Sequence, residues 1–264
     1  ERKIALMDYE IKQVDKFKFI ETGSGEPLLL LHGLFGALSN FSGLIDYFKR
    51  YNKVIVPMLP LFDLDILHTT VGGLEKFVNK FIERQNYRNV HLLGNSLGGH
   101  VALLHVLKHP EKIRSLILTG SSGLFESGMG DSYPKRGDYE YIKQKTELTF
   151  YDPAIATKEL IDEVYATVNN RIKAIKIIAL AKSAIRNNLG EEINQIKKPT
   201  LLIWGNNDSI TPPFVGREFH KLIPSSELHF VDHCGHAPMM ERPEEFNLIL
   251  HKFLRKLSEP ATVA

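Results

Sequence analysis

The chain has 264 residues, 33 of them basic and 31 acidic, so its formal net charge at pH 7 is +2. A chain of this length can bury roughly three quarters of the surface that it exposes when unfolded, so the fold needs no covalent staples. The single cysteine, Cys234, excludes an internal disulfide framework and is compatible with a reducing compartment. The basic residues are scattered rather than gathered into a stripe, which argues against nucleic acid as a partner.

A stretch without Asp, Glu, Lys or Arg runs from residue 27 to residue 45 and raises the question of a membrane span. Proline, glycine and polar residues interrupt it, among them Pro27, His32, Gly33, Gly36 and Asn40. We therefore predict a strand, a loop and the start of a helix, and no membrane span. No charged-then-apolar leader is visible, and we expect a cytoplasmic protein.

Short apolar runs alternate with longer helical patterns, which is the order of strands and crossover helices in a mostly parallel sheet. Strands are predicted at residues 28–31, 54–56, 90–93, 116–118, 201–204 and 228–231. Helical patterns cover residues 41–48, 74–84, 97–107, 213–222 and 243–257. The first segment, from Lys3 through Ile20 to a glycine turn at residues 23–25, predicts an antiparallel edge.

The alternation stops between about Ser121 and Gly190, where helical patterns follow one another without a strand. Thr157 has N-cap chemistry before an apolar face, and the next pattern has its apolar face at Ile175, Ile178, Ala181 and Ile185. Ligands of open α/β sheets bind at the carboxyl ends of the strands, and we expect the insert to lie there. The predicted organisation is a core of residues 1–120 and 191–264 with a helical cap at 121–190.

The sequence Gly94-Asn95-Ser96-Leu97-Gly98 joins the end of a predicted buried strand to the start of a helix. A serine in so sharp a turn has a strained backbone, and its hydroxyl stands clear of the sheet at the positive end of a helix. Glycines on both sides remove side chains that would collide. Ser96 is therefore the candidate nucleophile.

A serine hydroxyl needs a base beside it, and the base needs a carboxylate that fixes its tautomer. His236 follows the last predicted strand, and Asp208 follows the strand at 201–204 by a short turn. His233 shares the loop of His236 and is the main rival for the base. Two other interpretations are an Asp208 that only closes its own turn and a metal site formed by His229, His233, Cys234 and His236. We expect the triad, and neither a metal nor a cofactor.

Acyl transfer also needs donors that face the developing oxyanion. The backbone N–H of Leu97, directly after the nucleophile, is one candidate. The second is expected from the loop His32-Gly33-Leu34-Phe35-Gly36, with Leu34 as the donor and His32 as a support of the loop.

These motifs together resemble a capped α/β-hydrolase from about residue 20 to the end of the chain. The resemblance implies a mostly parallel sheet of the eight-stranded α/β-hydrolase type, with helices on both faces and a helical cap. The elbow, with Asn95 before the serine, is similar to that of the meta-cleavage-product hydrolases, which split a carbon–carbon bond in dienoic acids. Those enzymes bind the substrate carboxylate with a cap arginine, where this chain has Val164. A tryptophan commonly follows their catalytic histidine, where this chain has Ala237.

The sequence favours a serine hydrolase of small or medium apolar carboxylic esters, with Phe35, Asn95 and Arg186 in the substrate pocket. Val164 stands where the related enzymes have their cap arginine, and the nearest arginines of the predicted cap are Arg171 and Arg186. Arg186 follows the apolar face that ends at Ile185. The runner-up is a carbon–carbon hydrolase. Interpretations of another class are a ligand receptor on a hydrolase fold and a binding module with an unused triad. A homodimer is left open.

Overall fold

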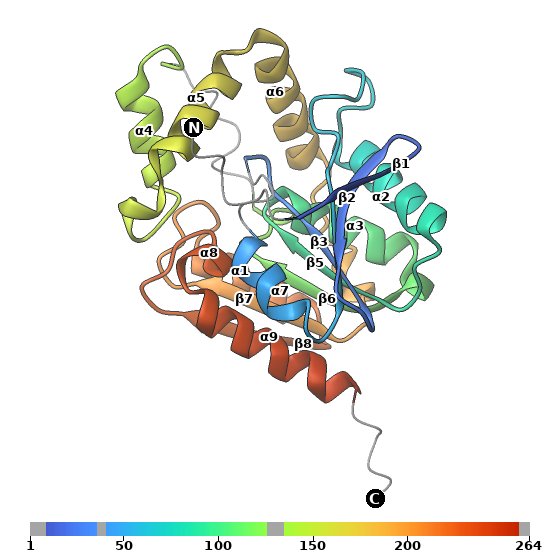
Figure 1. Ribbon diagram of the computed structural model, residues 1–264. Coiled ribbons are helices and arrows are strands. Elements are labelled where there is room, and N and C mark those ends of the chain that lie inside the picture. The colour runs from blue at the N-terminus through green and yellow to red at the C-terminus, as the bar shows by residue number, and fades with distance from the viewer. Residues whose placement is uncertain (1–8, 36–40, 126–134, 259–264) are drawn as a thin grey trace, which may run out of the picture.

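The computed structural model describes residues 9–35, 41–125 and 135–258, and its centre is one twisted sheet (Figure 1). The sheet has eight strands in the order β1-β2-β4-β3-β5-β6-β7-β8. Their bounds are β1 Ile11–Val14, β2 Phe17–Thr22, β3 Pro27–Leu31, β4 Lys53–Pro57, β5 Val90–Asn95, β6 Ile113–Thr119, β7 Thr200–Gly205 and β8 Ser226–Val231.

Strand directions follow the prediction of a mostly parallel sheet with an antiparallel edge. The pairs β1–β2 and β2–β4 are antiparallel, and every pair from β4 to β8 is parallel. All six strands predicted from apolar runs are present. Parallel strands bring their carboxyl ends to one edge of the sheet, so the loops after β3, β5, β6, β7 and β8 meet there.

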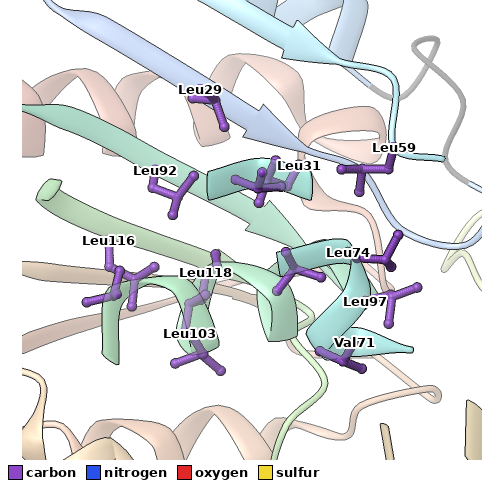
Figure 2. Packing of buried hydrophobic residues seen from close by; sticks show 14 of the residues in the cluster. Leu29, Leu31, Leu59, Val71, Leu74, Leu92, Leu97, Leu103, Leu116 and Leu118 are labelled. Atoms are coloured by element: carbon purple, nitrogen blue, oxygen red, sulfur yellow. The ribbon is translucent and has the colours of Figure 1, made fainter. Parts of the chain in front are cut away.

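Helices cover both faces of the sheet (Figure 1). Outside the segment between β6 and β7 they are α1 Ser42–Phe48, α2 Val71–Gln85, α3 Leu97–Lys108, η2 Pro110–Lys112, α7 Pro213–Leu222, α8 Pro238–Glu241 and α9 Pro243–Ser258. Side chains alternate between the faces of a strand, so Leu29 and Leu31 of β3 pack with α2 and α3, whereas Leu28 and Leu30 pack with α1 and α9. Figure 2 shows the first of these two clusters.

The segment between β6 and β7 contains α4 Tyr139–Glu147, η3 Pro153–Ile155, α5 Lys158–Asn169, α6 Arg171–Arg186 and η4 Ile193–Gln195. We call α4, α5 and α6 the insert. The Thr157 side chain accepts a hydrogen bond from the Leu160 N–H and caps α5, as predicted. Ile142, Val164 and Ile177 of the insert form an apolar cluster that also contains Leu34 and Phe35 of the loop after β3. The insert therefore packs against this loop, at the carboxyl edge of the sheet.

The predicted apolar face of α6 was wrong. Ile175, Ile178 and Ile185 are 49%, 39% and 46% exposed. The buried face consists of Ala174, Ile177, Leu180, Ala181, Ser183 and Ala184. Ser183 Oγ accepts a hydrogen bond of 3.0 Å from the N–H of Val71, the first residue of α2. At this contact with α2 the buried residue is the small Ser183, while Ile177 and Leu180 are buried elsewhere on the same face and the other isoleucines lie on the outer side of the helix.

The uncharged stretch 27–45 contains β3 and the first turn of α1, with residues 36–40 outside the described part of the chain. In the described segments, none of the helices combines the length and the apolar character that crossing a bilayer requires.

Candidate active site

Ser96 occupies a strained turn between β5 and α3, as the sequence predicts. Its φ and ψ angles are 53° and −121°, and its hydroxyl does not cap the helix that begins at Leu97. A Cβ on Gly94 would lie 2.4 Å from the Gly98 carbonyl oxygen, and a Cβ on Gly98 would lie 2.1 Å from the Leu31 carbonyl oxygen. Only glycine fits at these two positions, so the glycines are what allow the turn.

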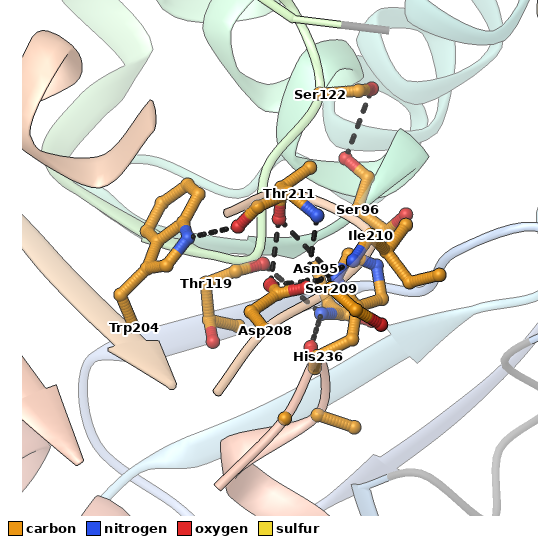
Figure 3. A network of polar contacts seen from close by, with 12 residues as sticks. Asn95, Ser96, Thr119, Ser122, Trp204, Asp208, Ser209, Ile210, Thr211 and His236 are labelled. Atoms are coloured by element: carbon orange, nitrogen blue, oxygen red, sulfur yellow. Dashed lines mark hydrogen bonds and ion pairs between the residues drawn. The ribbon is translucent and has the colours of Figure 1, made fainter. Parts of the chain in front are cut away.

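The side chains of His236 and Asp208 form a buried hydrogen-bonded pair at the same edge of the sheet (Figure 3). His236 Nδ1 lies 2.9 Å from Asp208 Oδ2, and the side chains are 8% and 0% exposed. A carboxylate oxygen only accepts, so Nδ1 carries the proton and the lone pair of the imidazole is on Nε2. This is the tautomer that a general base needs.

The Asp208 carboxylate is fixed by the loop that follows it. Its Oδ1 accepts hydrogen bonds from the backbone N–H of Ile210 at 2.8 Å and of Thr211 at 2.9 Å. The Thr211 hydroxyl donates to Oδ2 at 2.7 Å. The Thr211 carbonyl in turn accepts from the indole N–H of Trp204, in β7, at 2.8 Å. Donors on both oxygens satisfy the buried carboxylate and fix its orientation.

The loop of His236 is held from two sides. The His236 N–H donates to the Thr149 carbonyl at 2.9 Å, in the turn that follows α4. The Glu241 carboxylate accepts from the N–H groups of Gly235 at 3.0 Å and Ala237 at 3.3 Å, the two neighbours of the histidine. Charge-assisted hydrogen bonds of this kind are stronger than neutral ones, so Glu241 fixes the backbone that carries the ring.

The side chain of Asn95, the residue before Ser96, links the nucleophile turn to the loop of His236. The side chain of Asn95 donates to the carbonyl of Thr119 at 3.0 Å and to that of His236 at 3.3 Å. A Cβ on Gly120 would lie 2.9 Å from His236 Nδ1, so the chain after β6 passes directly along the ring. No hydrogen bond joins the Ser96 hydroxyl to His236 among the described residues, and such bonds often tighten only when substrate is bound.

The loop after β3 lies against the nucleophile turn. A Cβ on Gly33 would approach the Ser96 Cβ to 3.1 Å. His32 accepts from the Leu59 N–H through Nε2 at 3.2 Å and donates from Nδ1 to the Gly33 carbonyl at 2.8 Å. Burial lowers the pKa of His32, which keeps the ring neutral for this pair of bonds. His32 supports the loop, as expected.

The two candidate oxyanion donors sit on either side of this contact. Leu97 is the first residue of α3, so its N–H has no acceptor within the helix. Leu34 and Phe35 belong to the loop after β3 and pack against the insert, while Gly36 lies outside the described residues. The roles of Leu34 and Leu97, and of Phe35 as a pocket residue, stay predictions.

The structure does not support His233 as the base, and it does not bring His229, His233 and Cys234 into a metal site. His233 is exposed, has a φ of 49° and packs its ring against Tyr151. His229 is exposed as well, whereas Cys234 is fully buried, and burial raises the pKa of its thiol. Cys234 is a core residue.

Among the described residues, one group of metal-ligand type does exist, between α2 and α3. Glu75, His105 and His109 offer ligand atoms within 4.8 Å of one another. Glu75 is already bonded to His105 Nδ1 and to Lys108 Nζ, both at 3.0 Å. A metal-bound histidine usually donates its second ring N–H to an acceptor, and the buried His105 Nε2 has no partner in the described structure. We interpret the group as a buried ion-pair network.

Two expected pocket residues take other positions. Arg186 is exposed at the end of α6, and Arg171 is exposed at its start, so neither turns inward. Asn95 is buried and uses its amide on two backbone carbonyls. In the described segments no lysine or arginine is buried, and Val164 lies in the apolar cluster of the insert.

Sequence reasoning missed Thr211 and Glu241. Thr211 follows Asp208 by three residues, and its hydroxyl also lies 3.3 Å from His236 Nδ1. The available signal was the spacing Asp-x-x-Thr, which places a hydroxyl back over a carboxylate in a tight turn. Glu241 had no comparable signal, because the backbone N–H groups of Gly235 and Ala237 reach its carboxylate only when α8 folds back on the histidine loop.

Comparison with known proteins identifies the family to which the chain belongs. A family model described as the alpha/beta hydrolase family matches residues 28–247, and the chain belongs to this family. Lipase 1 of Psychrobacter immobilis is 27% identical over 263 residues, which cover 90% of this chain and 82% of the lipase. A 2-hydroxy-6-oxononadienedioate/2-hydroxy-6-oxononatrienedioate hydrolase of Paraburkholderia phymatum is 30% identical, over 89% of each chain.

Among solved structures, the chain is similar to MGS-MChE2, an alpha/beta hydrolase enzyme from the metagenome of sediments from the lagoon of Mar Chica, Morocco. The two are 43% identical with a TM-score of 0.79, over 95% of this chain and 100% of the other. The fold predicted from the sequence is thereby confirmed.

Proposed function

We propose that the protein is a serine hydrolase that cleaves a small or medium apolar carboxylic ester through an acyl-enzyme. In this proposal Ser96 is the nucleophile, His236 the general base and Asp208 the acid that orients it. The observation that carries the proposal is the buried contact between His236 Nδ1 and Asp208 Oδ2, at the same sheet edge as the strained Ser96 turn.

The chemistry follows from these positions. Ser96 Oγ attacks the ester carbonyl while its proton moves to His236 Nε2, and the N–H groups of Leu34 and Leu97 stabilise the oxyanion. The C–O bond to the alcohol then breaks, and the imidazolium returns the proton to the leaving oxygen. A water molecule deprotonated by His236 attacks the acyl-enzyme, releases the carboxylic acid and restores Ser96. We further propose that the insert acts as a cap over this site.

The charge distribution of the insert supports a neutral ester over a carboxylate-bearing substrate. A carboxylate that enters an apolar pocket is costly without a cation. Val164 occupies an apolar cluster, and both Arg171 and Arg186 are exposed. Lipase 1, among the relatives, is named for ester cleavage.

A carbon–carbon hydrolase is the second candidate, because several relatives are named as dienoate hydrolases. Such an activity needs a cation near the loop after β3. The structure offers Lys173, which lies 5.2 Å from the ring of Phe62, itself packed on the cluster that contains Leu34 and Phe35.

Substrate preference separates the two candidates. We expect kcat/KM to be higher for p-nitrophenyl butyrate than for a 2-hydroxy-6-oxo-dienoate, since the described part of the chain offers the carboxylate no buried lysine or arginine. The comparison should include the parent, Arg186→Ala and Lys173→Ala. If the parent cleaves the dienoate efficiently and one of these substitutions abolishes the cleavage, the ester assignment is wrong. The substituted residue is then the cation that binds the substrate carboxylate.

The nucleophile is tested by covalent labelling. We expect Ser96→Ala to lower kcat by several orders of magnitude with the fold intact, and to abolish labelling by a fluorophosphonate. Ser122→Ala is the matched control, because the Ser122 N–H and hydroxyl contact the Ser96 carbonyl oxygen. Labelling that persists in Ser96→Ala would disprove the assignment, and a ligand-dependent rise in Tm without turnover would favour a receptor.

A further inference from the structure

The outer face of α6 has an unusual composition. Seven of its residues are exposed: the isoleucines Ile172, Ile175, Ile178 and Ile185 and the basic residues Arg171, Lys182 and Arg186. The four isoleucines are between 39% and 66% exposed. We call these seven residues the outer face of α6. Monomeric soluble proteins seldom expose several large apolar residues side by side, so this face indicates an interaction surface.

The opposite side of the same helix faces the candidate active site. Ile177 packs in the cluster that contains Leu34 and Phe35, the loop expected to hold one oxyanion donor. The inner face of α6 therefore contacts the loop after β3, and its outer face is exposed to solvent. Anything that binds the outer face lies one helix diameter, about 10 Å, from that cluster.

The charge on α6 has a single sign. The helix contains five basic residues and no acidic one, although the whole chain is close to neutral. Arg171, Lys182 and Arg186 make no ion pair with a described residue. Lys176 donates to the backbone carbonyls of the neighbouring segment at 2.6 Å. That segment carries Asp63 and Asp65, which are exposed, so we leave it out of the surface.

We propose that the outer face of α6 docks on an anionic lipid bilayer, with the helix lying in the interface. Apolar side chains interleaved with basic ones are the pattern of helices that bind such surfaces without spanning them. The inference deepens the proposed function, on which it rests for the substrate: esters dissolved in the bilayer would reach the site beside the insert.

A second copy of the chain fits this face less well. A two-fold dimer places the same surface against itself, so α6 would meet α6 and the basic residues would repel one another. A phospholipid surface of negative charge neutralises them instead. The favoured occupant is therefore the lipid surface, and self-association is an outcome that the experiment must detect.

The test is cosedimentation of the full chain with vesicles of phosphatidylcholine alone or mixed with phosphatidylglycerol. We expect binding to the mixed vesicles that weakens from 0.01 to 1 M salt, since the screening length falls from about 30 to about 3 Å. The double variant Arg171→Gln, Lys182→Gln should bind about 25-fold more weakly, at about fivefold per charge.

The apolar contribution is tested by a triple variant, Ile172→Ser, Ile175→Ser, Ile178→Ser, which should reduce binding by at least tenfold. Leu248→Ser, on α9, is the matched control, because Leu248 is also an exposed apolar residue at 50% exposure. It should bind like the parent. Hydrolysis of dissolved p-nitrophenyl butyrate should be unchanged in all three variants.

Three outcomes would overturn the docking proposal: no binding of the parent to mixed vesicles, parent-like binding of both α6 variants, or light scattering that shows a dimer dissociated by the isoleucine substitutions. If the protein hydrolyses the dissolved ester but does not bind vesicles, the docking proposal is wrong and the proposed function stands. If the protein binds vesicles but does not hydrolyse the ester, the proposed function is wrong and the docking of the outer face of α6 stands.

Discussion

Asp208→Asn is the sharpest test of the candidate triad, because the structure predicts that it leaves the fold intact and reverses the hydrogen bond to His236, while the Thr211 hydroxyl turns to accept from the new amide. The amide oxygen can take the place of Oδ1 and accept from the N–H groups of Ile210 and Thr211. The amide NH2 then takes the place of Oδ2 and faces His236 Nδ1, where it must donate. The imidazole proton moves to Nε2, and the ring no longer has a lone pair for Ser96.

The expected loss in kcat is as much as about 10⁴-fold, which corresponds to about 5 kcal/mol of transition-state stabilisation. The free energy of unfolding should change by less than about 1 kcal/mol, because the two backbone donors keep their acceptor. Asp208→Ala is the contrast. It leaves the Ile210 and Thr211 N–H groups without that acceptor, and we expect it to cost about 1 to 3 kcal/mol of stability for each N–H that stays buried and unpaired.

The assay is steady-state hydrolysis of p-nitrophenyl butyrate, with urea unfolding of each variant in parallel. KM should change little, because Asp208 is buried behind the histidine and does not touch substrate. If Asp208→Asn kept more than a tenth of the parent kcat while His236→Ala was inactive, orientation of His236 by Asp208 would not contribute to the reaction.

Two further predictions concern histidines. His236→Ala should abolish turnover, whereas His233→Ala should retain it within a few-fold, since His233 is exposed and contacts Tyr151. Equal losses of kcat in the two folded variants would mean that the base is wrongly assigned. Burial lowers the pKa of His100 from 6.5 to about 4, so the unfolded chain binds a proton at a higher pH than the folded one. Stability is therefore lost as the pH falls from 6.5 towards 4, by up to about 3 kcal/mol from this residue. Urea unfolding at pH 7 and pH 4.5 should show a smaller loss in His100→Gln, and an equal loss in both proteins would contradict this.

The nucleophile turn could be read from the sequence because its signal is local. An apolar run, a serine between glycines and a helical pattern occupy adjacent residues, and the steric requirement is met by Gly94 and Gly98 themselves. The order of Ser96, Asp208 and His236 after three predicted strands was equally informative, because parallel strands bring their carboxyl ends to one edge. The strands themselves were found for the same reason, as buried runs bounded by turns.

The partners of the triad residues depended on contacts between distant segments. Glu241 reaches the backbone of Gly235 and Ala237 only once α8 turns back on the loop. Thr149, in the turn after α4 and far from His236 in the chain, accepts the His236 N–H. Asn95, expected in the pocket, proved to be bonded to the carbonyls of Thr119 and His236.

The sequence by itself determined the elements, the order of the candidate catalytic residues and the nucleophile turn, because each rests on residues that are neighbours in the chain. Tertiary structure alone decided which face of α6 is buried. Apolar residues occur on most sides of that helix, so periodicity alone did not single out the buried face, which in the fold combines Ile177 and Leu180 with alanines and with Ser183, whose hydroxyl accepts from the Val71 N–H. The position of α6 against α2 and against the loop after β3, which no local pattern encodes, left Ile172, Ile175, Ile178 and Ile185 exposed.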